Sequence, residues 1–177
     1  MTRRSVFRQP YTRHGKGQFT TILCPMVPRS IAALAAGLAL VALPAASQPV
    51  TVTDGDTIKF NGAIYRLWGI DAPEAKQWCG DYPAGAIASG ALVKLVEGAG
   101  SVTCEAKATD RYGRTVAICR ADGRDLGRAM VRLGMAWAFV RYSDDYIADQ
   151  KAAAAAGLGI HHHDCVPAWD WRAARRH

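Results

Sequence analysis

The first 47 residues contain no Asp or Glu, although they hold six of the chain's 22 Lys and Arg residues. Residues 48–177 therefore carry 16 basic and 15 acidic side chains, a net charge of +1 against +7 for the whole chain. This balance excludes a general positive field as the source of any nucleic-acid affinity. Affinity for phosphate would have to come from individual arginines held in fixed positions.

Residues 1–47 also lack an apolar run that is long enough to span a membrane. The run Ile31–Leu43 has only 13 residues and is followed by the small residues Ala45 and Ser47, which is typical of a cleaved export signal. We predict a leader at 1–47, with Met26 as an alternative start; an uncleaved anchor or a buried helix is the other interpretation. The mature protein would be secreted or periplasmic, without stable membrane association.

Four cysteines remain once the leader is removed, namely Cys79, Cys104, Cys119 and Cys165. An even number in an exported chain favours two disulfides, for which three connectivities exist. Cys104 and Cys119 lie nearly symmetrically about Tyr112-Gly113, so a hairpin tip there would place them on neighbouring strands. This favours the pair Cys104–Cys119 and leaves Cys79–Cys165; four reduced, buried thiols are the alternative.

No internal repeat and no regular alternation of strands with helices is present, which argues against repeat architectures and a parallel α/β sheet. Asn61-Gly62 is typical of a two-residue hairpin turn. Residue patterns predict strands at 50–52, 57–60, 63–70, 101–106, 115–120 and 135–140. Helices are predicted to begin near Asp81, Asp125 and Ser143. We expect an α+β fold with a small barrel as its sheet.

Two acidic residues flank the predicted hairpin: Asp56 begins one strand and Asp71 ends the other. Counted outward from the turn, they are expected to meet across the ladder. Two carboxylates at one end of a sheet repel each other unless a cation lies between them, and oxygen ligands suit a hard ion such as Ca²⁺. The alternative is that these acids are turn residues, which accounts less well for Asp71 and Glu74.

Arg66 lies five residues before Asp71, which on a regular strand places the two side chains on opposite faces. A shared site therefore requires a bend or bulge, for which Gly69 is the expected position. Arg114 follows the second hairpin tip. Two guanidinium groups, a bound cation and the carboxylate of Glu74 suit phosphodiester hydrolysis, in which Glu74 would orient or deprotonate water. Solvated surface ion pairs are the alternative.

Three segments resemble the staphylococcal nuclease-like, or thermonuclease, family in sequence, order and approximate spacing: 54–57, 66–74 and 109–114. The resemblance covers about 50–160 and implies an OB-fold five-stranded β-barrel with three α-helices. We assign this domain to 48–165 and a Trp- and Arg-rich tail to 166–177. The resemblance also implies calcium-dependent cleavage of DNA and RNA that leaves 3′-phosphate ends.

The resemblance further implies roles for individual residues. The calcium ligands would be the carboxylates of Asp56 and Asp71, with the backbone carbonyl of Ala72 facing the ion. Glu74 would activate water, while Arg66 and Arg114 would bind phosphate. The expected substrate contacts are Arg111, Tyr112 and Tyr142. Val140 replaces an aromatic residue of the family, which leaves base preference open.

Other interpretations concern the whole domain and its end. The domain could be a non-catalytic OB-fold module that binds nucleic acid or a protein partner in the envelope, or a disulfide-stabilised envelope protein with a vestigial site. The run His161–Cys165 could bind a transition metal, although a surface loop is favoured. The tail could contact nucleic acid, although packing on the domain is favoured. We expect a monomer acting on DNA and RNA, with single-stranded or unwound regions favoured.

Overall fold

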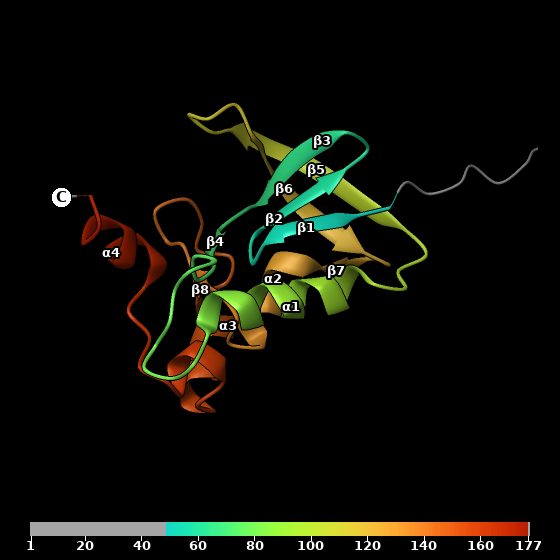
Figure 1. Cartoon of the computed structure of the whole chain (residues 1–177). Coiled ribbons are helices and arrows are strands. Elements are labelled where there is room, and N and C mark those ends of the chain that lie inside the picture. The colour runs from blue at the N-terminus through green and yellow to red at the C-terminus, as the bar shows by residue number, and fades with distance from the viewer. Residues whose placement is uncertain (1–48, 177) are drawn as a thin grey trace, which may run out of the picture. The chain divides into compact units, whose positions relative to one another are not determined.

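The computed structural model describes residues 49–176, so the predicted leader, the alternative start Met26 and His177 lie outside the described residues. The strands are β1 (Thr51–Asp54), β2 (Thr57–Phe60), β3 (Ala63–Leu67), β4 (Ile70–Asp71), β5 (Val102–Thr109), β6 (Thr115–Ala121), β7 (Arg124–Asp125) and β8 (Trp137–Ala138) (Figure 1). The helices are α1 (Ala84–Val96), α2 (Leu126–Arg132), α3 (Ile147–Ala155), the 3₁₀ turn η1 (Gly159–His161) and α4 (Ala168–Ala173).

The main sheet has the strand order β1-β2-β3-β6-β5, and β7 pairs with β6. β3 and β6 are parallel, whereas the other pairs in this sheet are antiparallel. β4 and β8 form a separate antiparallel pair. The α+β prediction is confirmed, with five strands on the main path; within the described residues the pairings run from β1 to β5 without a pairing that closes the ring.

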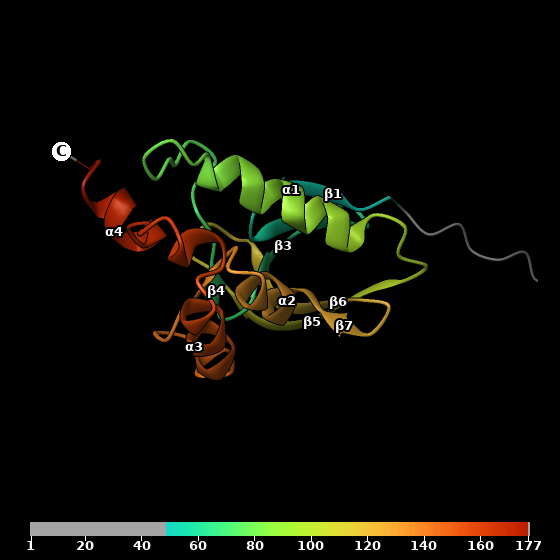
Figure 2. The ribbon, with the colours of Figure 1, turned by 90° about the horizontal axis from the view of Figure 1, so that it is seen from below.

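The helices bury the apolar faces of this sheet. α1 packs against β1 and α2, and α2 packs in turn against β6 and α3. Viewed from below, α1 covers one side of the strands and α2 lies beside β6 (Figure 2). The core between them is built from fully buried side chains that include Ile58, Leu67, Leu92, Leu126 and Met130. Burying apolar surface of this kind is the main force that holds the sheet and helices together.

A second, smaller cluster attaches the C-terminal segment to the domain. Trp137, Ile160 and Ala168 are buried together, with Cys165 and Trp169 packed against them. α4 consequently lies at the end of the domain where β4 and β8 pair, away from β1 and β7 (Figures 1 and 2). The expectation that the tail packs on the domain is confirmed for its first turn.

The hairpin and the helix ends follow the sequence closely. Asn61 and Gly62 both have positive φ, as a tight hairpin turn requires. The carboxylate of Asp125 accepts a hydrogen bond from the Arg128 amide and caps α2, and Gly134 follows that helix with positive φ. The predicted strand 63–70 is wrong in one respect: it is divided into β3 and β4 by a turn at Trp68-Gly69.

Both predicted disulfides are present. Cys104–Cys119 joins directly opposed residues of β5 and β6, and Cys79–Cys165 joins the segment before α1 to the segment before α4. Disulfides of this kind are typical of proteins outside the cytoplasm. Within residues 49–176, no helix has the length and apolar character that crossing a membrane requires.

Candidate active site

The centre of the site is an arginine held between two buried carboxylates. Arg66 donates from Nη1 to Asp56 Oδ1 at 2.9 Å and from Nη2 to Asp71 Oδ1 at 2.6 Å. Asp56 is 4% exposed and Asp71 is fully buried. The second oxygen of Asp56, Oδ2, accepts a hydrogen bond from the Ala72 amide at 3.1 Å. The predicted convergence of the two acids and Arg66 is therefore found.

The route by which these residues converge differs from the expected one. Asp56 does not face Asp71 across the ladder, because its carbonyl accepts a hydrogen bond from the Leu67 amide. Asp71 returns to the site through the turn at Trp68-Gly69, where Gly69 has φ +68°. A Cβ at Gly69 would lie 3.0 Å from the ring of Tyr146. The bend that sequence reasoning required is thus a complete turn rather than a bulge in a continuous strand.

Gly55 fixes the other acidic segment by close packing. A Cβ there would lie 2.7 Å from the Cβ of Ala72 and 2.9 Å from that of Ala88 on α1. Asp54 accepts a hydrogen bond from the Asp56 amide at 3.1 Å, as is common in Asx turns. The turn between β1 and β2 is therefore pressed against the segment that follows Asp71, which brings Asp56 next to Ala72.

Burial controls the protonation of this cluster. It raises the pKa of Asp56 to about 7, although the Arg66 guanidinium lowers that pKa; Asp54 and Asp71 raise it further. Burial alone lowers the pKa of Arg66, but Asp56 and Asp71 outweigh burial, so that this pKa lies above its usual value. Arg66 therefore remains a cation. Its positive charge compensates two carboxylates that would otherwise repel each other.

A second arginine reaches the cluster from α4. Arg172 donates from Nη2 to Asp71 Oδ2 at 2.7 Å and from Nη1 to Glu74 Oε1 at 2.5 Å. Burial lowers the pKa of Arg172, but its hydrogen bonds to Asp71 and Glu74 raise it well above the usual range. Asp71 thus binds two guanidinium groups, and Glu74, which is partly exposed, binds one.

The tip between β5 and β6 supplies the opposite side of the site. β3 and β6 run parallel with Tyr65 opposite Thr115, so Arg114, the residue just before β6, lies near the beginning of β3. The Asp110 carboxylate accepts hydrogen bonds from Arg114 Nε at 2.7 Å and from the Arg114 amide at 2.9 Å. Burial raises the pKa of Asp110, but these bonds outweigh it and hold that pKa below its usual value. Arg114 is consequently held in a fixed position.

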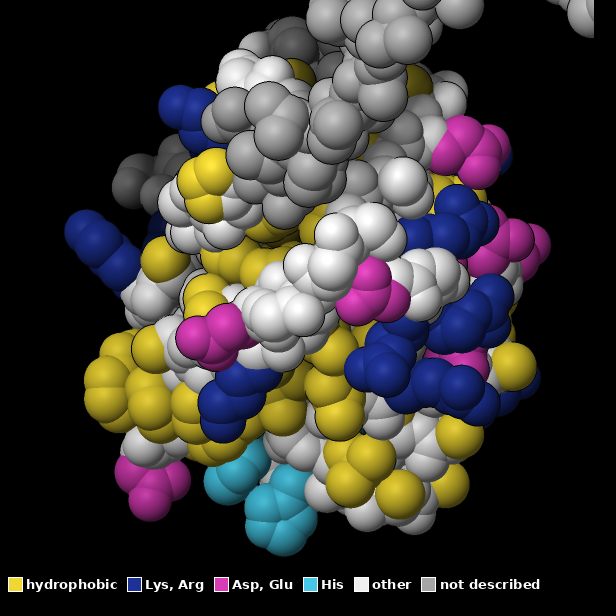
Figure 3. All heavy atoms as spheres, turned by 90° about the vertical axis from the view of Figure 1, so that its right-hand side faces the viewer, with side chains coloured by type: hydrophobic (Ala, Val, Ile, Leu, Met, Phe, Trp, Pro, Cys, Tyr) yellow, Lys and Arg dark blue, Asp and Glu magenta, His cyan; other side chains and the backbone are white. Residues whose placement is uncertain are grey.

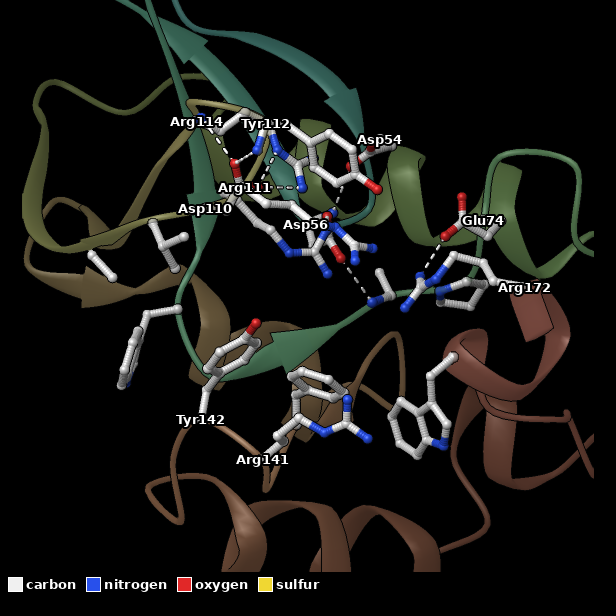
Figure 4. A pocket seen from close by; sticks show the side chains of 18 of the residues that line it. Asp54, Asp56, Glu74, Asp110, Arg111, Tyr112, Arg114, Arg141, Tyr142 and Arg172 are labelled. Atoms are coloured by element: carbon white, nitrogen blue, oxygen red, sulfur yellow. Dashed lines mark hydrogen bonds and ion pairs between the residues drawn. The ribbon is translucent and has the colours of Figure 1, made fainter. Parts of the chain in front are cut away.

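A cavity of about 670 Å³ connects these groups. Eight predicted site residues line it: Asp56, Arg66, Ala72, Glu74, Arg111, Tyr112, Arg114 and Tyr142. Asp71 lies beneath the wall, covered by Arg66 and Arg172. Figure 4 shows the hairpin tip with Arg111, Tyr112 and Arg114 on one side, Glu74 and Arg172 on the other, and Asp56 between them.

Aromatic rings follow one wall of this cavity. Tyr142 lies 5.0 Å from Phe139 between ring centroids, and Phe139 lies 5.5 Å from Trp169 on α4. All three residues line the cavity, as does Trp68, whose ring is 6.3 Å from that of Tyr142. At the other wall the guanidinium of Arg111 lies 4.9 Å from the Tyr112 ring. The cavity therefore offers both cationic groups and flat apolar surfaces.

The charge on one face of the domain is mixed. On the face that lies to the right in Figure 1, acidic and basic side chains are interspersed over the visible surface (Figure 3). This agrees with the nearly neutral balance of residues 48–177. Fixed arginines at the cavity are consequently the stronger source of affinity for an anion.

The histidine run does not converge on one point. The His163 ring stacks on Tyr82 at 3.9 Å, the exposed His162 meets His163 edge to face, and His161 Nε2 is buried without a hydrogen-bond partner. Burial lowers the pKa of His161. No cluster of three or more His, Cys, Asp or Glu side chains suited to a metal ion is found in residues 49–176.

Comparisons with known proteins identify the family of this chain. The family model for "Staphylococcal nuclease homologue" matches residues 65–163, more than half of the chain. The chain belongs to this family. An "uncharacterized endonuclease" of Escherichia coli is 37% identical over 131 residues, which cover 70% of this chain and 82% of that protein. An "uncharacterized endonuclease" of Haemophilus influenzae is 36% identical over 118 residues, 63% of each chain. "Staphylococcal-like nuclease CAN1" of Arabidopsis thaliana is 33% identical over 118 residues, but these cover only 33% of that protein.

Staphylococcal nuclease homologues are typically metal-dependent, and the donor set of this chain fits a hard cation. Asp56 and Asp71 converge on Arg66 and offer carboxylate oxygens, which are the preferred ligands of Ca²⁺ and Mg²⁺, whereas Glu74 does not complete a group of three with them. The guanidinium of Arg172 lies between Asp71 and Glu74 and supplies positive charge there. The site is thus one at which a cation is already stabilised.

Sequence reasoning did not assign Asp110, Arg172 or Trp169 to this site, although it named Trp169 and Arg172 within a tail that could contact nucleic acid. Asp110 lies within the segment that resembles the family, and its position four residues before Arg114 could have indicated the ion pair. Arg172 and Trp169 belong to the tail, where only the Trp- and Arg-rich composition marked them. Their contacts depend on how the tail folds back, and no local pattern specifies this.

Proposed function

We propose that this protein is an exported, calcium-dependent nuclease that hydrolyses phosphodiester bonds of DNA and RNA as an endonuclease of the thermonuclease type. The observation that carries the proposal is the arrangement of Arg66 between Asp56 and Asp71 in a cavity that Glu74 and Arg114 also line. By family resemblance the products carry 3′-phosphate ends.

Each group has a distinct task in this reaction. Asp56 and Asp71, with the backbone carbonyl of Ala72, would hold a calcium ion, which when bound supplies positive charge to the phosphate and to water. Glu74 is partly exposed to the cavity and orients or deprotonates the attacking water. Arg66 and Arg114 donate hydrogen bonds to the phosphate oxygens as negative charge develops on them. Asp110 keeps Arg114 in position for this purpose.

The cavity walls support a substrate with accessible bases. Tyr112 and Tyr142 are exposed, and Phe139 and Trp169 continue the aromatic surface. Bases of a single strand stack on such rings, a contact worth about 1–3 kcal/mol per base, whereas paired bases cannot reach them. We therefore expect single-stranded or unwound DNA and RNA to be preferred, with Arg111 contributing a phosphate contact. We expect a monomer.

Export is supported by the two disulfides, which form in oxidising compartments. The leader at residues 1–47, the domain at 48–165 and the tail at 166–177 belong to the same proposal. N-terminal sequencing of the secreted or periplasmic protein tests it: cleavage near Ser47 is the expected result, and an intact Met1 or Met26 would contradict it.

Digestion of single-stranded DNA, duplex DNA and RNA with Ca²⁺ or with chelator tests the activity. Wild type should cut in Ca²⁺ alone, and Glu74→Gln and Arg114→Ala should each lower the rate by about 10²-fold or more. The matched controls are Glu97→Gln and Arg124→Ala, which replace exposed residues outside the cavity. Both controls should cut at the wild-type rate.

The rival function is binding without cleavage. A protein of that kind would bind a single-stranded oligonucleotide with measurable affinity but release no shorter products in Ca²⁺. If wild type cuts no faster than Glu74→Gln and Arg114→Ala, the nuclease proposal fails and the binding module replaces it.

A further inference from the structure

Arg172 places a guanidinium on two of the groups assigned to the reaction, Asp71 and Glu74. Its Nη1 lies 3.2 Å from Asp71 Oδ1 and 2.5 Å from Glu74 Oε1, and its Nη2 lies 2.7 Å from Asp71 Oδ2. Asp71 is fully buried and Arg66 already binds its Oδ1. Both oxygens of Asp71 are therefore occupied by protein cations.

The segment that carries Arg172 is held firmly beside this site. The Cys79–Cys165 disulfide fixes its beginning, and the buried side chain of Gln77 donates from Nε2 to the Val166 carbonyl at 2.6 Å. The other end of the same amide accepts a hydrogen bond from the Glu74 backbone at 3.2 Å. Gln77 thus links the segment of Glu74 directly to the base of α4.

Packing adds a third attachment, since Trp169 lies edge to face against Trp137 at 6.1 Å between ring centroids. Trp137 pairs with Asp71 in the ladder of β4 and β8. Arg172 is one turn farther along α4, so its side chain reaches Asp71 from a helix anchored on the neighbouring strand. Figure 4 shows the same side chain beside Glu74. An arginine placed by a disulfide, a buried amide and an aromatic contact is a built feature rather than a freely rotating surface side chain.

We propose that Arg172 is a resident counter-cation of this site and that it exchanges with the metal ion: the guanidinium occupies Asp71 and Glu74 when no metal is bound, and metal binding displaces it. This inference rests on the proposed function, in which Asp71 holds the ion. Three carboxylates, Asp56, Asp71 and Glu74, face two guanidinium groups here. A divalent cation added at Asp71 would meet the like charge of Arg172 and would compete for Asp71 Oδ2.

Exchange has two consequences for the chain. Without metal, Arg172 stabilises a buried carboxylate and keeps Glu74 engaged, so the site is closed to water activation. Once displaced, the guanidinium remains tethered at the cavity that Arg172 also lines, within reach of a phosphate. The protein would therefore bind metal more weakly than its carboxylates alone allow, and half-maximal nuclease activity would require a higher calcium concentration.

Calorimetric titration of the purified mature protein with Ca²⁺, without nucleic acid, measures the exchange. Arg172→Gln should bind Ca²⁺ about tenfold more tightly than wild type, within the usual range of coupling between competing ligands. Arg172→Lys, which keeps a charge but loses the forked geometry, should lie between the two. The matched control is Arg175→Gln, two residues past the end of α4, whose guanidinium donates to the Trp171 carbonyl and lies over the Trp171 ring; its affinity should equal that of wild type. Asp71→Asn should abolish the binding heat, which verifies that the titrated site is this one.

Thermal unfolding supplies an independent measurement. In chelator Arg172→Gln should melt below wild type, and in saturating Ca²⁺ the difference should disappear. Equal calcium affinities for wild type and Arg172→Gln, or weaker binding by the variant, overturn the exchange while leaving the nuclease proposal intact. If neither protein binds Ca²⁺, both the exchange and the calcium assignment fail. Binding by Arg172→Gln alone supports the exchange in its strongest form.

Discussion

Asp71 is held by two arginines that belong to very different parts of the molecule. Arg66 lies five residues away on β3, a strand paired on both sides by β2 and β6. Arg172 lies 101 residues away on α4, which has six residues and depends on a small apolar cluster and one disulfide. The Arg66 side chain is 20% exposed and that of Arg172 is 31% exposed. One side of the site is therefore fixed by the sheet. The other side is fixed by the attachment of α4 through the Cys79–Cys165 disulfide and the small apolar cluster, which we call the tether.

The largest expected effect is loss of the tether. Cys79–Cys165 spans 86 residues and Cys104–Cys119 spans 15. Because a longer loop loses more entropy when it is closed, replacing the first pair by serine should lower the free energy of unfolding by about 4–5 kcal/mol, and replacing the second by about 3 kcal/mol. Denaturant unfolding of the two double variants in chelator measures the order; the reverse order would show that the tail contributes less than the sheet.

The next effect separates the two arginines directly. Arg66→Met leaves Asp56 and Asp71 buried without their common cation, so the free energy of unfolding should fall by about 3–5 kcal/mol. Arg172→Met should cost about 1–2 kcal/mol, because Asp71 keeps Arg66 and the lost ion pair is partly exposed. The measurement is unfolding in chelator at low and high salt. Equal losses would mean that the sheet and the tether hold Asp71 equally.

The same contrast explains what could be predicted from the sequence. The side built on β2, β3 and β4 uses local chemistry: a hairpin turn at Asn61-Gly62, a glycine where the chain must turn, and acids at the strand ends. These patterns predicted that Asp56 and Asp71 meet, and that Arg66 joins them if the chain bends at Gly69. The α+β class was predicted from the order of strands and helices, Cys104–Cys119 from its symmetry about Tyr112-Gly113, and Cys79–Cys165 by elimination. Arg172 could not be predicted, because its contact depends on the tertiary position of a short helix that no periodicity specifies.

The pairing between the strands that carry Asp56 and Asp71 was predicted incorrectly, although both strands were predicted. Counting outward from the turn placed Asp71 opposite Asp56, whereas the ladder ends at Arg66 opposite Thr57 and the chain then turns. The turn at Gly69, which has a positive φ, ends the ladder before Asp71 can pair with Asp56. Sequence alone does not distinguish such a turn from a bulge. The sequence pattern of residues 63–70 is that of one continuous strand, although the backbone leaves the strand at Trp68-Gly69.

Gly69 tests how strictly this turn is required. Gly69→Ala forces φ +68° on an L-residue and brings a Cβ to 3.0 Å from Tyr146, so unfolding free energy should fall by about 2 kcal/mol. Gly62→Ala is the matched control, since its φ is +75° but no atom lies within 4 Å of the added Cβ. It should cost about 1 kcal/mol. If the two losses are equal in chemical denaturation, packing against Tyr146 contributes nothing to the position of Asp71.

The smallest expected effect concerns the hydrogen bond between Tyr146, which packs against the Gly69 turn, and Asp125. Tyr146 is buried and donates from Oη to Asp125 Oδ2 at 3.0 Å, while Asp125 also caps α2. Tyr146→Phe keeps the ring against Gly69 and removes only this bond, so the loss should be about 1 kcal/mol near neutral pH.

The pH dependence of this loss identifies its cause. Burial raises the pKa of Tyr146 above its ordinary value of 10.0, and Asp125 raises it further. Above pH 10 the unfolded chain therefore releases the phenolic proton while the folded chain retains it, and the stability that Tyr146 contributes declines as pH rises. The difference in unfolding free energy between wild type and Tyr146→Phe should be constant from about pH 7 to 9 and shrink at higher pH. A difference that grows with pH would mean that the phenolate is stabilised in the fold and that the ring is not held against the Gly69 turn by a neutral hydrogen bond.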